Sequence, residues 1–230
     1  MGELLTAFAK GLFLVPLTLL PIINPVGVAP IYLSLLGRVD QATNRYVAQR
    51  VGINAIFVLL VAMFGGAQLL GFFGISLPIV RVAGGLIVAA TAWSLLSDPN
   101  ADSATEDVGH AERSSTDVLR NSFYPLTFPF TVGPGSIAAA ITLGAALSAR
   151  RATFNTQLAS HVGMGLGVVL TASVIYLCYR YAPQLVRALG SVGTTVLLRF
   201  SAFILLCVGV QIVWDGVADL VLELSREMAH

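Results

Sequence analysis

Apolar residues occupy six long runs of the 230-residue chain, and shorter, more polar or turn-forming segments separate them. The runs cover 4–36, 51–73, 77–96, 123–147, 158–181 and 196–222. A transmembrane helix needs about 20 consecutive apolar residues to cross the hydrocarbon core of a bilayer. The pattern therefore predicts an all-α membrane protein with six transmembrane spans.

Two of these runs carry a proline and glycine interruption, from Asn24 to Gly27 in the first run and from Gly133 to Ser136 in the fourth. Proline lacks a backbone N–H and clashes with the carbonyl group four residues earlier, so it breaks or kinks a helix. Inside a membrane, a broken helix persists only where protein or a watery cavity covers the freed backbone groups. We therefore predict that the first and fourth helices are each broken into two half-helices.

The two halves of the chain repeat these features in the same order. Each half begins with an interrupted helix, has an arginine near the start of its third span (Arg81 and Arg199) and an aspartate late in that span or after it (Asp98 and Asp215). Because each half holds an odd number of spans, the two copies must face opposite ways across the membrane, as an inverted repeat. The alternative is that membrane helices of similar composition align by chance. The predicted units are a first three-span repeat (1–97), an acidic cytoplasmic loop (98–121) and a second three-span repeat (122–230).

Composition agrees with a membrane protein and limits the function. Hydrophobic residues make up 56% of the chain and charged residues only 11%, with a mean hydropathy of +0.83. The net charge of +1 gives no basis for nucleic-acid binding. Cys178 and Cys207 fall inside apolar runs without clustered ligands, so we expect both to pack as small hydrophobes. The sequence shows no motif for a nucleophile, a catalytic base or a metal cluster, and we expect no enzyme activity, cofactor or metal site.

The chemistry predicted at the two interruptions is that of backbone groups. The first N–H groups of a helix have no partner within the helix and carry partial positive charge, which favours an anion such as a carboxylate. The carbonyl groups freed on the preceding half-helix accept an ammonium group or a cation. Two facing interruptions would hold both ends of a small zwitterion, whereas the alternative is that proline and glycine only kink the helices for packing. The predicted substrate-binding residues are Asn24, Pro25, Gly27, Thr131, Gly133, Pro134, Gly135, Ser136 and Gln211.

Few carboxylates fall within the spans. Asp98, Asp215 and Asp219 lie at or near the ends of predicted spans, where we expect a charge at the membrane surface. A proton relay through acids at the middle of the membrane is therefore poorly supported. If transport is coupled to Na⁺ or H⁺, we expect freed backbone carbonyls near the interruptions to coordinate the ion.

Basic residues predict the orientation, because they accumulate on the cytoplasmic side of membrane proteins. An even number of spans places both termini on one side, together with Lys10, Arg81, Arg150, Arg151 and Arg226. The opposite side carries eight arginines, namely Arg38, Arg45, Arg50, Arg113, Arg120, Arg180, Arg187 and Arg199. We therefore expect both termini to be periplasmic and the acidic loop to be cytoplasmic.

Several segments, in the same order over 12–216, carry a resemblance to a known family. They are Leu20-Pro-Ile-Ile-Asn-Pro-Val-Gly, Phe73-Gly-Ile-Ser-Leu-Pro, Arg81-Val-Ala-Gly-Gly-Leu-Ile-Val-Ala, Pro125-Leu-Thr-Phe-Pro, Gly133-Pro-Gly-Ser-Ile-Ala and Leu206-Cys-Val-Gly-Val-Gln. The chain resembles the MarC family of bacterial integral membrane proteins at these segments. The resemblance implies a six-span protein of the bacterial inner membrane, and some members of that family are described as transporters of small neutral amino acids such as glycine and alanine. The positions that match the motif of the family are Asn24, Pro25, Gly27, Gly133, Pro134 and Gly135.

The residues and the resemblance together predict a secondary transporter, exporter or importer, of small neutral amino acids, with its site near the bilayer midplane. Sparse charge within the spans suits a neutral zwitterion better than a charged metabolite. Two alternatives stay open: a passive channel or drug-efflux protein, and a non-transporting regulatory protein that acts through the loop 97–121. The expected partners are the amino acid, the lipid bilayer and a coupling ion, Na⁺ or H⁺. A homo-oligomer is compatible with the sequence but not required by it.

Overall fold

The chain is almost entirely helical in the part that the computed structural model describes, which comprises residues 2–37, 39–97, 122–148 and 153–228. The helices are α1 (Gly2–Ile23), α2 (Pro25–Leu36), α3 (Gln41–Phe72), α4 (Leu77–Ser97), η2 (Ser122–Thr131), α6 (Pro134–Leu147), α7 (Phe154–Arg180) and α8 (Ala182–Met228). Within these ranges, five helices are long and apolar enough to cross a membrane, or six if η2 and α6 form one bent span. The prediction of an all-α membrane protein is confirmed. The predicted acidic loop, with Asp98, lies outside the described residues.

Three helices extend well beyond the apolar runs from which they were predicted. α3 begins at Gln41, where Asp40 caps it by accepting a hydrogen bond from the backbone N–H of Thr43 at 3.3 Å, so part of the predicted polar connection is helical. α7 begins four residues before its apolar run, at Phe154. α8 includes the connection after α7, bends at Gly190 (φ 66°, ψ −175°) and continues to Met228. As a result, Asp215 lies more than three turns before the end of its helix rather than close to it.

Both proline and glycine interruptions coincide with helix boundaries. α1 ends at Ile23, and Asn24 adopts a left-handed conformation (φ 47°) before Pro25 begins α2. Between η2 and α6, Gly133 is extended and Pro134 occupies the first helical position, and the two helix axes form an angle of 68°. Proline at this position loses no helical hydrogen bond, which explains why each new helix begins there.

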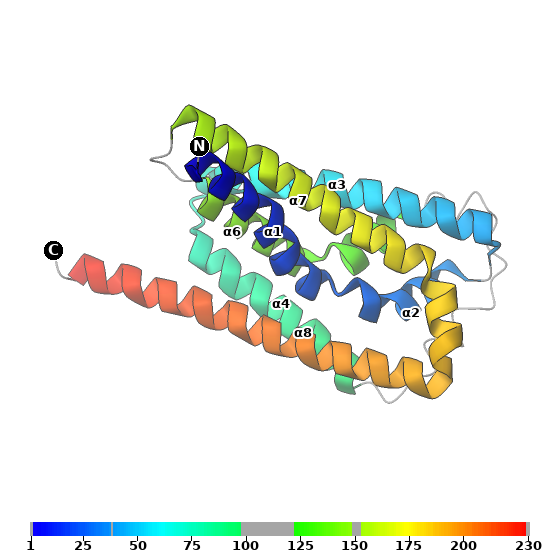
Figure 1. Cartoon of the computed structure of the whole chain (residues 1–230). Helices are drawn as coiled ribbons and strands as arrows, with labels where there is room; N and C mark the ends of the chain where they lie inside the picture. The colour runs from blue at the N-terminus through cyan, green and yellow to red at the C-terminus, as the bar shows by residue number, and fades with distance from the viewer. Residues whose placement is uncertain (1, 38, 98–121, 149–152, 229–230) are drawn as a thin grey trace.

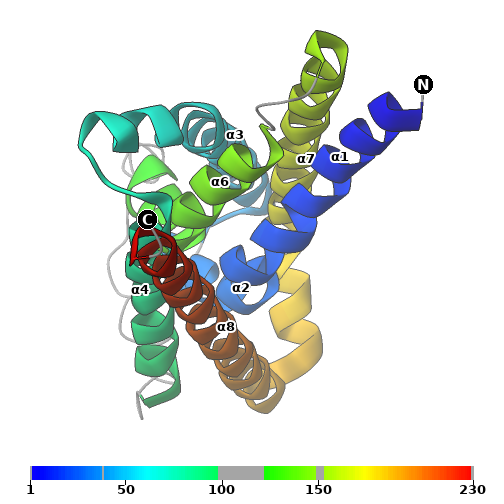
Figure 2. The same ribbon diagram turned by 90° about the vertical axis from the view of Figure 1, so that its left-hand side faces the viewer.

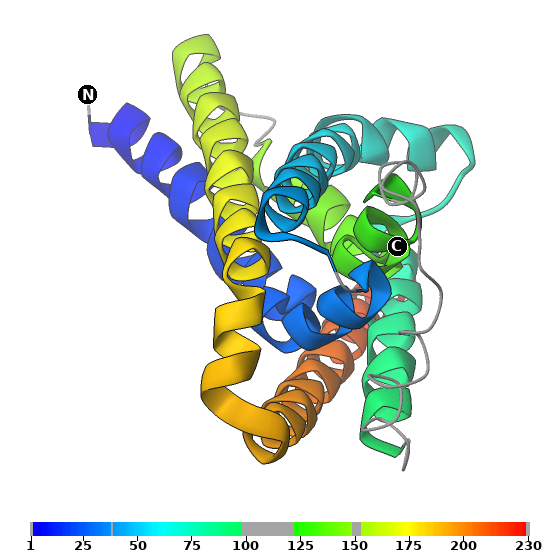
Figure 3. The same ribbon diagram turned by 90° about the vertical axis from the view of Figure 1, so that its right-hand side faces the viewer.

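Two pairs of helices pack with their backbones in close contact. α1 runs beside α7, and α4 runs beside α8, as Figures 2 and 3 both show. Glycine permits this approach: a Cβ atom on Gly11 would lie 2.6 Å from the backbone nitrogen of Met164, and one on Gly209 would lie 2.6 Å from that of Ala89. Small residues at helix interfaces are typical of membrane proteins, where van der Waals packing drives helix association.

The bundle buries its main core between α1, α2, α3, α6 and α7, and a smaller cluster joins α1, α4 and α8. Its outer surface is strongly apolar, with large exposed side chains that include Phe57, Phe72, Trp93, Val192 and Trp214. Such a surface would be unusual for a soluble protein and suits contact with lipid. α1 begins and α8 ends at the same end of the bundle (Figure 1).

Candidate functional site

The first interruption is built from Asn24 and packs against α8. The Asn24 side-chain oxygen accepts a hydrogen bond from the backbone N–H of Gly27 at 3.2 Å, which satisfies one of the free donors at the start of α2. Pro25 and Gly27 are buried, and a Cβ atom on Gly27 would lie 2.5 Å from the Cβ atom of Ser201 in α8. The predicted residues of this interruption therefore form a close helix contact.

The second interruption packs against α4. Gly135 and Ser136 are buried, whereas Pro134 is exposed. A Cβ atom on Gly135 would overlap the Val88 side chain and lie 3.3 Å from the carbonyl oxygen of Gly84. Gly133 has no side chain to cap α6. The first N–H groups of α6 are thus held close to α4.

Thr131 is oriented toward α7 rather than toward either interruption. Its hydroxyl group donates a hydrogen bond to the carbonyl oxygen of Leu126 at 2.6 Å and lies 2.9 Å from the hydroxyl oxygen of Tyr179. The Tyr179 ring stacks on that of Tyr32, with ring centroids 4.3 Å apart. These contacts connect η2, α7 and α2, and they occupy the Thr131 hydroxyl group.

A cavity of about 410 Å³ lies between α1, α4, α6 and α8, next to both interruptions. It reaches Ile22, two residues before Asn24, and Ala138, three residues after Gly135. Much of the wall is formed by small side chains, and its polar lining comes from five residues. These are Thr18 of α1, Arg81 of α4, Thr142 of α6, and Asp215 and Asp219 of α8.

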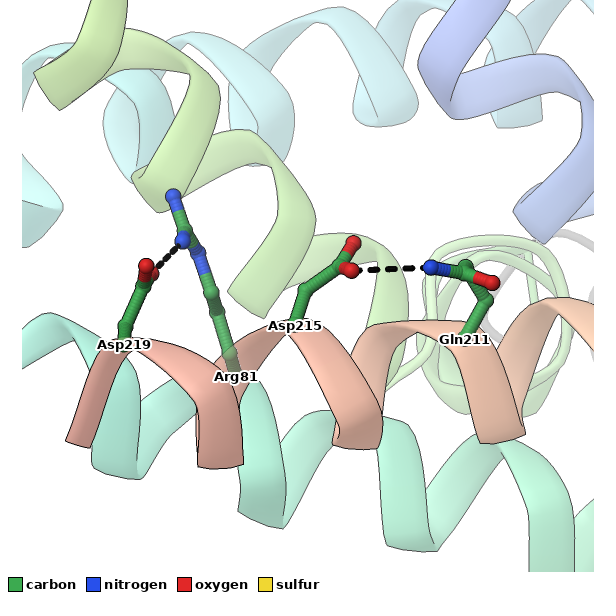
Figure 4. Close-up of polar contacts among 4 residues, drawn as sticks. All are labelled: Arg81, Gln211, Asp215 and Asp219. Atoms are coloured by element: carbon green, nitrogen blue, oxygen red, sulfur yellow. Dashed lines mark hydrogen bonds and ion pairs between the residues drawn. The ribbon is translucent and has the colours of Figure 1, made fainter. Parts of the chain in front are cut away.

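The charged residues of this cavity lie on facing helices, as Figure 4 shows. The Arg81 guanidinium group forms an ion pair with the Asp219 carboxylate. One turn earlier on α8, Asp215 accepts a hydrogen bond from the Gln211 side-chain nitrogen at 2.8 Å. Residues four apart share one face of a helix, so Gln211, Asp215 and Asp219 form a polar line along the side of α8 that faces α6.

Thr142 adds a free hydroxyl group to the same cavity. Its oxygen is buried and has no hydrogen-bond partner among the described residues. Threonines in helices commonly donate to the carbonyl oxygen four residues earlier, as Thr171 does to Gly167 at 2.9 Å. Thr142 therefore brings an unpaired hydroxyl group to the wall of the cavity.

A larger cavity, of about 860 Å³, lies where the ends of α1, α6 and α7 meet. Residues of the first turns of α1 and α7 line it, including Glu3 and Thr156, so it opens at the end of the bundle. The smaller cavity is the better candidate site, because its lining approaches both interruptions, at Ile22 and Ala138, whereas first-turn residues of α1 and α7 line the larger one.

The predicted site and the observed cavity are neighbours but differ in their residues. None of the nine predicted residues lines the cavity, and within the described part of the chain Gln211 is the one among them that makes a hydrogen bond to a lining side chain, that of Asp215. The sequence predicts Asp215 and Asp219 at or near the end of the sixth span, whereas α8 continues to Met228, so both lie at least two turns before the end of the helix. The four-residue spacing of the polar residues along α8 is the sequence signal that indicates a shared face.

Comparison with known proteins is consistent with this membrane fold. The model of the family described as "MarC family integral membrane protein" matches residues 9–221. The chain belongs to the MarC family. Similar relatives include proteins named "UPF0056 inner membrane protein MarC" from Salmonella typhimurium (strain LT2) and Escherichia coli (strain K12). Each is 28% identical over 228 residues, which cover 96% of this chain and 98% of the relative.

No solved structure matches the chain. The match to the MarC family begins at residue 9, within α1, and extends into the last turns of α8, so it includes part or all of every helix that lines the cavity. Within the described residues, no group of three or more histidine, cysteine, aspartate or glutamate side chains could hold a metal ion.

Proposed function

We propose that this MarC-family protein is a secondary transporter of small neutral amino acids, such as glycine and alanine, in the bacterial inner membrane. The observation that carries the proposal is the cavity of about 410 Å³, which holds Arg81, Asp215 and Asp219 among apolar helices and adjoins both interruptions. Ionised side chains within membrane spans are costly, and those that face an internal cavity typically mark a substrate or ion pathway.

The size and lining of the cavity suit a small polar molecule. Four alanines line it, namely Ala138, Ala139, Ala146 and Ala218, so the wall has few bulky side chains. Ligand cavities of proteins measure about 300–1,000 Å³, and this one lies near the lower end of that range. A neutral amino acid also matches the mixed charge of the lining, because it carries one group of each sign.

An inverted repeat would explain the helix contacts. Exchanging the two halves maps α1 onto η2, α2 onto α6, α3 onto α7 and α4 onto α8. Under this exchange, the contact between α2 and α8 corresponds to the contact between α6 and α4. In the same way, the contact between α1 and α6 corresponds to the contact between η2 and α2. The contacts of α3 with α7 and of α4 with α8 map onto themselves. We therefore propose two inverted three-span repeats, 1–97 and 122–230, whose broken first helices meet near the bilayer midplane.

Alternating access then follows from the position of the cavity between two helix groups. The α4 and α8 pair forms one wall, while α1 and α6 form the other. Rocking of the α4 and α8 pair against the other helices would close the cavity on one side and open it on the opposite side. The predicted residues Asn24, Pro25, Gly27 and 133–136 would lie at its closed end. In this proposal both termini are periplasmic, and Na⁺ or H⁺ serves as the coupling ion.

Transport by purified protein in liposomes tests this function. Uptake and efflux of labelled glycine, alanine and serine are measured with imposed sodium or proton gradients and compared with protein-free liposomes. The proposal predicts saturable flux of at least one of these amino acids. Flux that rises linearly with concentration would indicate a channel. No flux of any of the three would contradict the proposed function.

A further inference from the structure

The two acidic residues of α8 that line the cavity have different surroundings. The Asp219 carboxylate is neutralised by Arg81, whereas the described partner of Asp215 is an uncharged amide, that of Gln211. The second carboxylate oxygen of Asp215 has no hydrogen-bond partner among the described residues. The cavity therefore contains one carboxylate whose charge no side chain of the lining balances.

We infer that Asp215 binds the ammonium group of the amino acid and Arg81 binds its carboxylate, while Thr142 donates or accepts a further hydrogen bond. This inference rests on the proposed transport function and assigns its substrate contacts. Asp215 is an exposed residue that lines the cavity more than three turns before the end of α8, so a ligand that enters the cavity can reach it.

An ammonium group fits the environment of Asp215 better than a metal cation does. A hard cation such as Ca²⁺ takes six to eight oxygen ligands, and Mg²⁺ takes six. The side-chain oxygen ligands of the lining are the Asp215 and Asp219 carboxylates and the Thr18 and Thr142 hydroxyl groups, and Asp219 is already paired with Arg81. An ammonium group has three donors and needs only about that many acceptors.

Arg81 has donors to spare for a carboxylate. A guanidinium group carries five N–H donors, and the one bonded nitrogen of Arg81 is Nη1, which donates to Asp219. The other donors have no partner within the described part of the chain. A substrate carboxylate can therefore share Arg81 with Asp219 or replace Asp219 on it.

The spacing of these groups matches an α-amino acid. Asp215 and Asp219 are four residues apart on α8, so their Cβ atoms are about 6 Å apart, and Arg81 lies against Asp219. In an α-amino acid a single carbon atom separates the ammonium group from the carboxylate. A ligand of this kind can contact Arg81 and Asp215 at once, with its side chain directed toward the alanines of the cavity wall.

Binding measurements on the full chain in detergent, with glycine as the probe, test this assignment. Asp215→Asn keeps the shape of the side chain and removes its charge, and we expect it to weaken glycine binding by about 10- to 100-fold. Glu223→Gln, two turns further along the same helix, is the matched control, because Glu223 is exposed and does not line the cavity. It removes one negative charge from α8 and should leave glycine affinity unchanged. Unfolding midpoints without ligand establish that both variants are folded.

Two glycine derivatives separate a contact with the ligand from a structural effect. N-acetylglycine lacks the ammonium group, so wild-type protein should prefer glycine to it, and Asp215→Asn should largely abolish that preference. Glycinamide lacks the carboxylate, and Arg81→Gln should abolish the preference for glycine over glycinamide. A variant that only loosens the fold would weaken all ligands alike.

Other outcomes overturn the inference in distinguishable ways. If wild-type protein transports glycine or alanine but Asp215→Asn keeps glycine affinity within about threefold, Asp215 does not bind the substrate and the transport function stands. If Asp215→Asn abolishes only the response to a sodium or proton gradient, Asp215 binds the coupling cation instead. If wild-type protein neither binds nor transports any of the three amino acids, the inference fails together with the proposed function.

Discussion

Replacing Asn44 with alanine should destabilise the bundle strongly, because this one side chain joins three helices. Asn44 lies in the first turn of α3 and is 3% exposed. Its nitrogen donates to the carbonyl oxygens of Tyr179 and Arg180, at 3.4 and 3.2 Å, where α7 ends. Its oxygen accepts a hydrogen bond from the Tyr32 hydroxyl group of α2 at 3.0 Å.

The size of the effect follows from these three bonds. A buried hydrogen bond contributes about 1 kcal/mol, so Asn44→Ala should lower the free energy of unfolding by about 2–4 kcal/mol. The Tyr32 hydroxyl group can still donate to the backbone oxygen of residue 44, now 3.3 Å away, which limits the loss. Asn54→Ala is the matched control, because Asn54 makes a single described bond, to the Thr127 hydroxyl oxygen at 3.3 Å. It should cost about 1 kcal/mol or less.

Unfolding of the purified variants in detergent, with increasing SDS and circular dichroism as the signal, measures both effects. The expected order of stability is wild type, then Asn54→Ala, then Asn44→Ala. If Asn44→Ala unfolds at the same SDS fraction as Asn54→Ala, the three bonds do not stabilise the junction of α2, α3 and α7, and the reasoning is refuted.

Three further predictions concern the helix boundaries and contacts. Gly167→Leu should separate α1 from α7, because a Cβ atom there would lie 2.8 Å from the Gly11 carbonyl oxygen. Gly165→Leu should be tolerated, because its Cβ atom would meet nothing within 4 Å. Equal unfolding midpoints of the two variants would contradict this. Asn24→Ala should weaken glycine binding more than Asn24→Gly, since glycine adopts φ 47° freely and alanine does not. Equal weakening by both variants would contradict this. The hydrogen bond from Thr43 holds the pKa of Asp40 below its usual value, so the cap of α3 is complete at neutral pH and is lost as the pH falls through that lowered pKa. Asp40→Asn should retain the cap at both neutral and acidic pH. Hydrogen exchange of the first amides of α3 at these two pH values measures the effect, and equal acid sensitivity in wild type and variant would contradict the prediction.

The helix boundaries at the interruptions were accessible from sequence because local chemistry sets them. Pro25 and Pro134 each begin a helix for reasons confined to their own backbone, and the resemblance to the MarC family pointed to the same segments. The beginning of α3 was not accessible in this way. In the sequence, Asn44 and its polar neighbours resemble a loop between two spans. The Asn44 side chain is buried favourably only because it forms hydrogen bonds with α2 and with the end of α7.

The residues of the cavity depended on packing that a single sequence does not contain. The four-residue spacing of Asp215 and Asp219 places both on one face of α8, but it does not determine which helix that face contacts. The packing of α4 against α8 brings Arg81 to Asp219. Thr142 belongs to an apolar helix and carries no distinguishing pattern. Its importance arises because α6 directs it toward the space between α1, α4 and α8.

Counterflow in proteoliposomes tests the central claim, transport by alternating access at this cavity, most directly. Liposomes that contain the protein are loaded with unlabelled glycine or alanine, and entry of a trace of the same labelled amino acid is followed against unloaded liposomes. The account predicts that internal substrate accelerates and transiently concentrates the label and that the effect saturates. Asp215→Asn should lose the effect, while Glu223→Gln, outside the cavity lining, should retain it. Label entry that is unaffected by internal substrate, or equal in both variants and wild type, would contradict the account.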